Sequence, residues 1–160
     1  MATHLLPQDI TLPSLESSQR TPQLDITIQA TINADPRRIF HALTMPEYLE
    51  VWMSLPEPDM HSGVVALRNA NSYRIDFYRS ENLDASITGS FRIHKTDKLV
   101  LTWRKFGVLD DAQSIVNILL QGGIGRCILE LRHTGLPSYE ESLWHQRMWR
   151  TSLRNLAQLF

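Results

Sequence analysis

The sequence predicts an α+β fold in which a curved antiparallel β-sheet wraps around a long C-terminal helix. Three patterns lead to this prediction: a half-buried strand followed at once by two short helices, a series of closely spaced strands, and a final amphipathic helix. The strands follow one another too closely to leave room for crossover helices. Neighbouring strands must therefore run antiparallel.

The first strand is predicted over residues 24–33, where apolar and polar residues alternate. A period of two places every apolar side chain on one face of a half-buried strand. The apolar members are Leu24, Ile26, Ile28, Ala30 and Ile32.

Two short helices are predicted next, each opened by a proline. Asp35 supplies an N-cap and Pro36 a first-turn proline for a helix over residues 37–44. Met45 and Pro46 end that helix and start another, over residues 47–52. A strand that leads into a broken helix pair can hold a curved sheet open on one side, which favours a container over a catalyst.

Six further strand segments are predicted from alternation and turn residues. They cover residues 63–67 (a short edge strand), 73–78, 85–93, 99–103, 114–120 and 127–132. The glycine-rich segment 121–125 joins the last two. No Lys-Ser or Lys-Thr opens a helix after it, so a hairpin turn is favoured over a phosphate-binding loop.

The last helix begins at a capping box and runs to the C-terminus. In the segment 138–141, the serine side chain and the third-position glutamate are expected to satisfy each other's backbone donors. The apolar stripe comprises Leu143, Trp149, Leu153, Leu156 and Phe160, and Arg147, Arg150 and Arg154 mark the solvent side.

Composition narrows the function classes. The 160 residues, 42% of them apolar, suffice for one domain with a sizeable core, which we place at residues 23–160 after a flexible extension over residues 1–22. A net charge of −1 argues against a nucleic-acid surface. No apolar run approaches a membrane span, and a single cysteine fits a reducing compartment, so we expect a cytoplasmic protein.

Three segments resemble a known family. They are ADPRRIFHALTMPEYLEVW (residues 34–52), KLVLTW (98–103) and LRHTGLPSYEESLWHQRMWRTSLRNL (131–156). They are similar to the domain related to the activator of Hsp90 ATPase, within the START/Bet v 1-like (SRPBCC) superfamily. The resemblance covers roughly residues 24–160 and implies the helix-grip fold. It is poorly informative about activity, because one fold hosts many functions.

The inward phase of these elements defines a candidate ligand site between sheet and final helix. We expect a small hydrophobic or amphipathic ligand, such as a lipid or an aromatic metabolite, because such spaces are apolar with few polar groups. The candidate lining residues are Phe40, Tyr48, Trp52, Tyr73, Ile75, Phe77, Phe91, Leu101, Trp103, Ile118, Leu129, Trp149 and Leu153.

No catalytic or metal constellation is predicted, and no cofactor. The six histidines show no paired metal spacing, and Cys127 falls on an inward phase as a small apolar filler. His133 and His145 are explained by capping and hydrogen bonding. Asp76 and Asn117 fall on outward phases and are expected at the surface.

Two other functions stay open. One, which the resemblance implies, is a cyclase-like or hydrolase-like enzyme, for which Tyr48, Tyr73 and Glu50 would be the acid and base. The other, implied by the resemblance, is a protein-interaction module for an Hsp90-type chaperone. Separately, the outward-facing Leu119 and Ile128 predict a weak homodimer.

Overall fold

A computed structural model of the protein describes residues 24–55, 71–106 and 113–160, together with the backbone of residues 60–64. The extension expected over residues 1–22 lies outside these ranges. The described elements are β1 (Ile26–Ile32), α1 (Pro36–Thr44), α2 (Pro46–Trp52), β2 (Met60–Val64), β3 (Ser72–Arg79), β4 (Asn82–Lys95), β5 (Lys98–Lys105), β6 (Ser114–Gly123), β7 (Arg126–Thr134) and α3 (Tyr139–Ala157).

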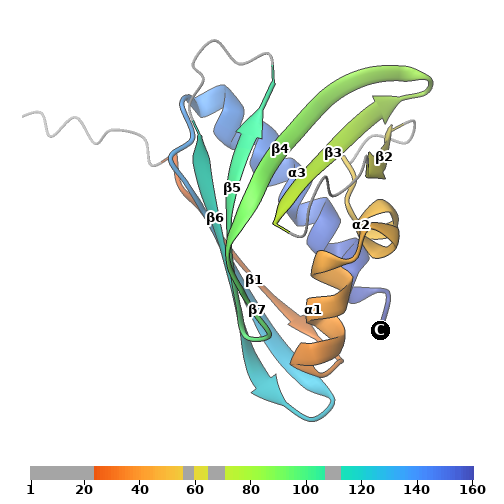
Figure 1. The fold of residues 1–160 in the computed structure, drawn as a ribbon, viewed down its shortest axis with the longest axis vertical. Helices are drawn as coiled ribbons and strands as arrows, with labels where there is room; N and C mark the ends of the chain where they lie inside the picture. Colours follow the sequence, from red (N-terminus) through yellow and green to blue (C-terminus); the bar gives the residue numbers. More distant parts are fainter. Residues whose placement is uncertain (1–23, 56–59, 65–70, 107–112) are drawn as a thin grey trace, which may run out of the picture.

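The described strands form one antiparallel sheet in the order β1-β7-β6-β5-β4-β3-β2. Strands β2 to β7 pair in sequence order, and β1 joins the far edge beside β7. Figure 1 shows the sheet bending around α3, with α1 and α2 beside the C-terminal half of that helix. The predicted α+β architecture is confirmed. The predicted edge strand at residues 63–67 instead spans Met60–Val64, and residues 65–67 lie outside the described ranges.

The hairpin between β6 and β7 turns at Ile124 and Gly125, as the glycine-rich segment predicts. Gly125 has φ +78°, a left-handed conformation that glycine adopts without strain. Its N–H donates to Asp35 Oδ1 at 2.6 Å. Asp35 does occupy the N-cap position of α1, but its side chain makes no capping hydrogen bond there. The carboxylate instead ties the hairpin to the start of α1.

The start of α3 departs from the expected capping box in one respect. Ser138 Oγ accepts from Glu141 N–H at 3.2 Å, as predicted. The Glu141 carboxylate reaches across to β5, where Lys105 Nζ lies 3.1 Å from Oε1 and 3.2 Å from Oε2. This ion pair therefore connects the first turn of α3 to the sheet.

The inner face of α3 supplies much of the core. Trp149, Leu153 and Leu156 are buried as the stripe predicts, whereas Leu143 and Phe160 are only half-buried. The arginines of the predicted solvent side, Arg147, Arg150 and Arg154, are exposed. Sequence reasoning did not place His145, Met148 and Ser152 in this core, yet each is at most 1% exposed.

Strands β4 and β5 separate at Gly89 and Ser90. Regular pairing stops after Thr88 and resumes at Phe91. In the gap, the phenol of Tyr73 donates to the Thr102 carbonyl oxygen, and Ser90 N–H donates to Thr102 Oγ1 at 2.8 Å. A Cβ on residue 89 would overlap both that carbonyl oxygen and the phenol, so only glycine fits. Side chains thus replace the missing ladder bonds.

Asp76 is buried, although the sequence predicted it at the surface. It faces away from α3, as its phase predicts, but it is 2% exposed. Arg74 Nε lies 3.0 Å from Asp76 Oδ1, and Ser86 Oγ donates to the same oxygen. Paired hydrogen-bond donors allow a carboxylate to be buried where an isolated one would be too costly. Asn117, the other residue expected at the surface, is half-buried.

Candidate functional site

A small apolar cavity of about 30 Å³ lies between the sheet, α2 and α3. It has room for roughly two water molecules. The space is small because three indoles fill most of the interior: Trp52, Trp103 and Trp149 are each 1% exposed. The container expected from the sequence is therefore present in outline but nearly filled.

Eight of the thirteen candidate lining residues meet around this cavity. They are Trp52, Tyr73, Ile75, Phe91, Leu101, Trp103, Ile118 and Trp149. Sequence reasoning missed four others: Leu43, Leu49, Met53 and Leu99. Leu99 shares the phase of Leu101, and Leu43 lies on the apolar side of α1, so the alternation and the helical period already carried a signal for these two.

The five remaining candidates lie elsewhere. Phe77, Leu129 and Leu153 are buried in the surrounding core. Phe40 is half-buried, with its ring centroid 4.9 Å from that of His94. Tyr48, which we expected to face inward, is 47% exposed.

The error at Tyr48 has a geometric cause. Leu49 and Trp52, three residues apart on α2, both face the core. Tyr48 is rotated by about 100° from Leu49 but by only about 40° from Trp52, four residues further on, so it lies at the edge of the buried face and its ring reaches solvent. In a helix of only seven residues, the apolar pattern alone does not fix which side is buried.

The aromatic side chains around the cavity have their polar atoms engaged elsewhere. Trp52 Nε1 donates to the Ala42 carbonyl oxygen at 2.7 Å, which ties α2 to α1. The Tyr73 phenol is held at Thr102, as described above. The indoles of Trp103 and Trp149 donate to histidines. The cavity therefore presents mainly carbon surface to any occupant.

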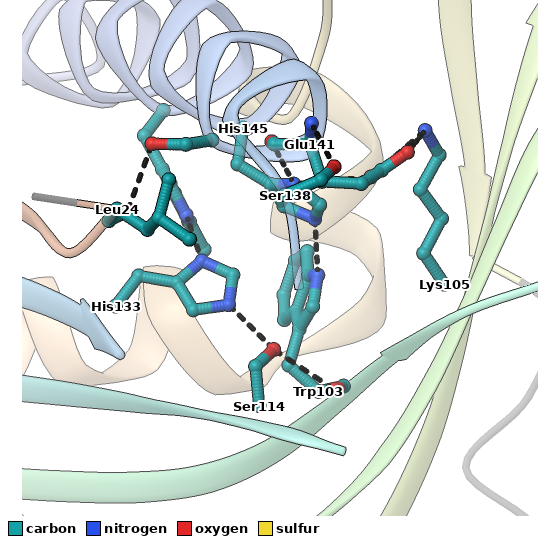
Figure 2. A network of polar contacts seen from close by, with 10 residues as sticks. Leu24, Trp103, Lys105, Ser114, His133, Ser138, Glu141 and His145 are labelled. Atoms are coloured by element: carbon teal, nitrogen blue, oxygen red, sulfur yellow. Dashed lines mark hydrogen bonds and ion pairs between the residues drawn. The ribbon is translucent and has the colours of Figure 1, made fainter. Parts of the chain in front are cut away.

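Two buried histidines accept these indole hydrogen bonds (Figure 2). Trp149 Nε1 donates to His133 Nδ1 at 3.0 Å, so the ring proton of neutral His133 is on Nε2. That nitrogen lies 2.7 Å from Ser114 Oγ, and the serine hydroxyl donates onward to the Trp103 carbonyl oxygen at 3.0 Å. One chain of hydrogen bonds thus runs from α3 through β7 and β6 to β5.

The second histidine has the opposite tautomer. Trp103 Nε1 donates to His145 Nε2 at 3.0 Å, so the proton of neutral His145 is on Nδ1, which donates to the Glu141 carbonyl oxygen at 2.7 Å. The two imidazole centroids lie 4.9 Å apart. Together the two chains connect α3 with β5, β6 and β7, and every partner in them is satisfied. We call Trp103, Ser114, His133, His145 and Trp149 the Trp–His network.

Both histidines are held neutral by their surroundings. Burial lowers the pKa of His145 to about 4; the hydrogen bond to Glu141 opposes this shift, and the Lys105 charge adds to it. Burial, together with the neighbouring His145, lowers the pKa of His133 well below its usual 6.5. Protonating either ring would remove the acceptor that its indole needs.

The contact between Ser114 and His133 resembles a nucleophile and its general base, but its protons are arranged the wrong way. His133 Nδ1 already accepts from Trp149, so His133 Nε2 carries a proton and donates to the serine. A general base must accept the serine proton. Ser114 is 3% exposed and His133 is fully buried, so substrate access is blocked as well. The arrangement is that of a structural network.

The acid–base residues considered for an enzyme are not brought together. Tyr48 and Glu50 are exposed on α2, whereas Tyr73 is buried on β3 with its phenol bonded to the Thr102 carbonyl oxygen. Burial also raises the pKa of Tyr73 well above its usual value. Tyr73 is therefore a hydrogen-bond donor of the sheet.

Two features are absent from the part of the chain that the structure describes. No three His, Cys, Asp or Glu side chains come together as a metal site requires. None of the described helices has the length and apolar character needed to cross a bilayer. Cys127, as expected of a filler, is 1% exposed.

Comparison with known proteins shows which family has this architecture. The model of the family described as activator of Hsp90 ATPase homolog 1-like protein matches residues 33–160. The chain belongs to this family. Its family model spans both helices after β1, the sheet from β2 onward and α3. No curated protein matches the chain.

Solved structures share the fold. Protein CV1439 from Chromobacterium violaceum has 20% sequence identity and a TM-score of 0.70, over 84% of this chain and 96% of that one. The AHSA1 protein from Silicibacter pomeroyi has 22% identity and a TM-score of 0.69, with the same coverage. At such identities the likeness is one of fold.

Proposed function

We propose that the protein binds a small, predominantly apolar molecule in the cavity between the sheet, α2 and α3. The observation that carries this proposal is the lining: leucines, isoleucines and aromatic rings whose polar atoms are already bonded within the protein. A ligand gains little there from hydrogen-bonding groups. An alkyl chain or an unsubstituted ring matches the surface best.

Such a ligand requires the cavity to expand. Ligand pockets usually measure about 300–1,000 Å³, an order of magnitude above the space present here. The wall best suited to move is α2, which contributes Leu49 and Trp52 and has only seven residues. The sheet side of the cavity is held by strand pairing on both sides of the lining: β3 pairs with β4, and β6 pairs with β5 and β7.

The segment after α2 is latched to α3, and this latch sets the cost of opening. Ser54 N–H donates to Ser152 Oγ at 3.0 Å, and the Ser152 hydroxyl donates back to the Ser54 carbonyl oxygen at 3.1 Å. Asn155 Nδ2 donates to the Trp52 carbonyl oxygen at 3.3 Å. Each of these hydrogen bonds contributes about 0.5–1.5 kcal/mol, so ligand binding has to offset a few kcal/mol.

Fluorescence titration tests the proposal directly. Trp52, Trp103 and Trp149 line the cavity, so a dansyl-labelled undecanoic acid bound there receives energy from three nearby indoles. We expect saturable energy transfer. We also expect tighter binding to Leu99→Ala, which enlarges the cavity. Leu131→Ala is the matched control, because Leu131 is fully buried but does not line the cavity.

Thermal unfolding of both variants separates a binding effect from a folding effect. Each truncation lowers the free energy of unfolding by about 2–5 kcal/mol, so the melting temperatures of both variants should fall by similar amounts. If neither the wild type nor Leu99→Ala gives saturable transfer with lipid or aromatic probes, the ligand-binding function is refuted.

A further inference from the structure

The inner face of β4 becomes exposed at His94, beside the apolar cavity. His94 pairs with Leu99 in the register of β4 and β5, and directly opposed residues point to the same face of a sheet. Leu99 is 2% exposed and lines the cavity, whereas His94 is exposed. The covering of the inner face therefore ends between these two residues.

A chain of aromatic rings connects the cavity with this exposed position. Tyr73 and Phe91 both line the cavity, and their ring centroids lie 5.7 Å apart. The His94 centroid lies 5.2 Å from that of Phe91 and 4.9 Å from that of Phe40 on α1. Exposure increases along the chain, since Tyr73 is 5% exposed, Phe91 is half-buried and His94 is exposed. The rings thus lead from the cavity to the surface.

Helix α1 forms the opposite side of this passage. Phe40 and Leu43 are three residues apart and therefore neighbours on one side of the helix. Leu43 lines the cavity, whereas Phe40 is half-buried against the core and contacts His94. Figure 1 shows α1 beside the turn that joins β4 and β5. We call Phe40, Phe91 and His94 the aromatic gate.

His94 offers the polar atoms that the cavity lacks. Inside the cavity, the indole and phenol groups are already bonded within the protein, so the polar head of a ligand would be buried there without a partner, which is costly. In the described part of the chain, the His94 imidazole contacts two phenylalanine rings and has no hydrogen-bond partner. A polar head at the gate meets solvent and ring nitrogens that can donate or accept a hydrogen bond.

We infer that the apolar cavity opens at the aromatic gate, between α1 and β4, and takes an amphipathic molecule whose terminal hydroxyl or carboxylate group stays at His94. This inference rests on the proposed function and adds to it the route of entry and the class of ligand. The apolar body lies among the cavity residues, where α2 moves to make room. The gate rings contact one another, so the side chains of Phe40 and His94 turn aside when a ligand passes.

Stopped-flow mixing with the dansyl-labelled undecanoic acid tests the route. Phe40→Ala removes one ring of the gate, so association and dissociation should both become about twofold to tenfold faster, as the loss of one aromatic pair from a barrier predicts. Tyr48→Ala is the matched control, because Tyr48 is an exposed aromatic residue on α2, outside the gate. Its rates should equal those of the wild type.

His94→Phe tests the position of the head group, because it keeps a ring in the gate and removes both nitrogens. Undecanol, undecanoate and toluene compete with the dansyl probe, whose own affinity is first measured for each protein. Undecanol and undecanoate should bind about twofold to tenfold more weakly to His94→Phe, which corresponds to the loss of one hydrogen bond. Toluene has no polar head and should bind unchanged. The two headed ligands tell a hydroxyl site from a carboxylate site.

The inference is overturned if Phe40→Ala leaves both rates unchanged, or if Tyr48→Ala accelerates them as much, because the ligand then enters elsewhere. It is also overturned if His94→Phe weakens toluene as much as undecanol, or weakens neither headed ligand. Thermal melting of each variant establishes that it is folded. Saturable probe binding without these differences identifies failure of the aromatic gate alone. If neither the wild type nor Leu99→Ala binds any probe, the proposed function fails and this inference fails with it.

Discussion

Acidification should destabilise the folded protein through the two histidines of the Trp–His network. In an unfolded chain, histidine titrates near pH 6.5. In the folded protein, burial lowers the pKa of His145 to about 4, and burial with the neighbouring His145 lowers the pKa of His133 well below 6.5. As the pH falls through 6.5, the unfolded chain takes up protons that the folded protein does not. Stability is therefore complete above pH 6.5 and is lost progressively below it.

The magnitude follows from the shift at His145. A pKa lowered from 6.5 to about 4 corresponds to about 3 kcal/mol, since each unit of pKa is worth about 1.4 kcal/mol. While one histidine is titrating, the slope of the unfolding free energy reaches about 1.4 kcal/mol per pH unit, and His133 adds to it in the same direction. Small domains have a total stability of only about 5–15 kcal/mol, so the loss is a large fraction.

Other charges face this part of the core. Glu141 Oε2 lies 3.6 Å from His145 Nδ1, and Lys105 Nζ is within 3.2 Å of both Glu141 carboxylate oxygens. Lys105 also lies over the Trp144 ring, 4.0 Å from its centroid. The positive charge of Lys105 opposes a second positive charge on His145, in line with the lowered pKa.

Urea unfolding at a series of pH values measures the effect. Unfolding is followed by tryptophan fluorescence and by circular dichroism between about pH 7.5 and 4.5. The double variant His133→Gln/His145→Gln should flatten the pH dependence, because glutamine takes up no proton in this range. His41→Gln is the matched control, since His41 is exposed on α1 and outside the Trp–His network. A wild-type stability that stays constant from pH 7 to 5, or an unchanged slope in the double variant, would refute this reasoning.

Three further predictions concern backbone, latch and assembly. Gly89→Ala should destabilise the protein by about 3 kcal/mol or more in urea unfolding, because the added Cβ overlaps the backbone of β5. Gly123→Ala is the comparison variant. It should stay close to wild type, because no atom lies within 4 Å of the added Cβ. Ser152→Ala removes the two latch hydrogen bonds to Ser54 and leaves the Asn155 bond to Trp52, so it should lower the unfolding free energy by about 1–2 kcal/mol, with faster hydrogen exchange at the Ser54 amide. Unchanged exchange would contradict the latch. Ile128, 45% exposed on β7, should support a weak dimer seen by light scattering and lost in Ile128→Glu. A wild type that stays monomeric at high concentration argues against this dimer.

Much of the fold was readable because local patterns and tertiary demands agree. Alternation of period two marked every strand from β3 to β7 to within a few residues. The prolines at positions 36 and 46 marked the starts of α1 and α2. Where agreement failed, a side-chain contact that the alternation does not encode decided the outcome. The alternation of β3 predicts Asp76 at the surface, yet Arg74 and Ser86 supply hydrogen-bond donors that offset the cost of burying its carboxylate. Asp35 is a proper N-cap residue whose carboxylate bonds instead to Gly125, 90 residues away.

The sequence by itself determined the elements, their inward faces and the antiparallel α+β arrangement, because these depend on periodicity and on turn residues close together in the chain. Only the tertiary structure decided how full the interior is and which groups meet there. Three indoles converge on a void of about 30 Å³, and two of them are paired with histidines 42 and 16 residues away. The physical reason is that periodicity sets the direction of a side chain, whereas packing volume and hydrogen-bond partners depend on distances across the sheet, which no local pattern contains.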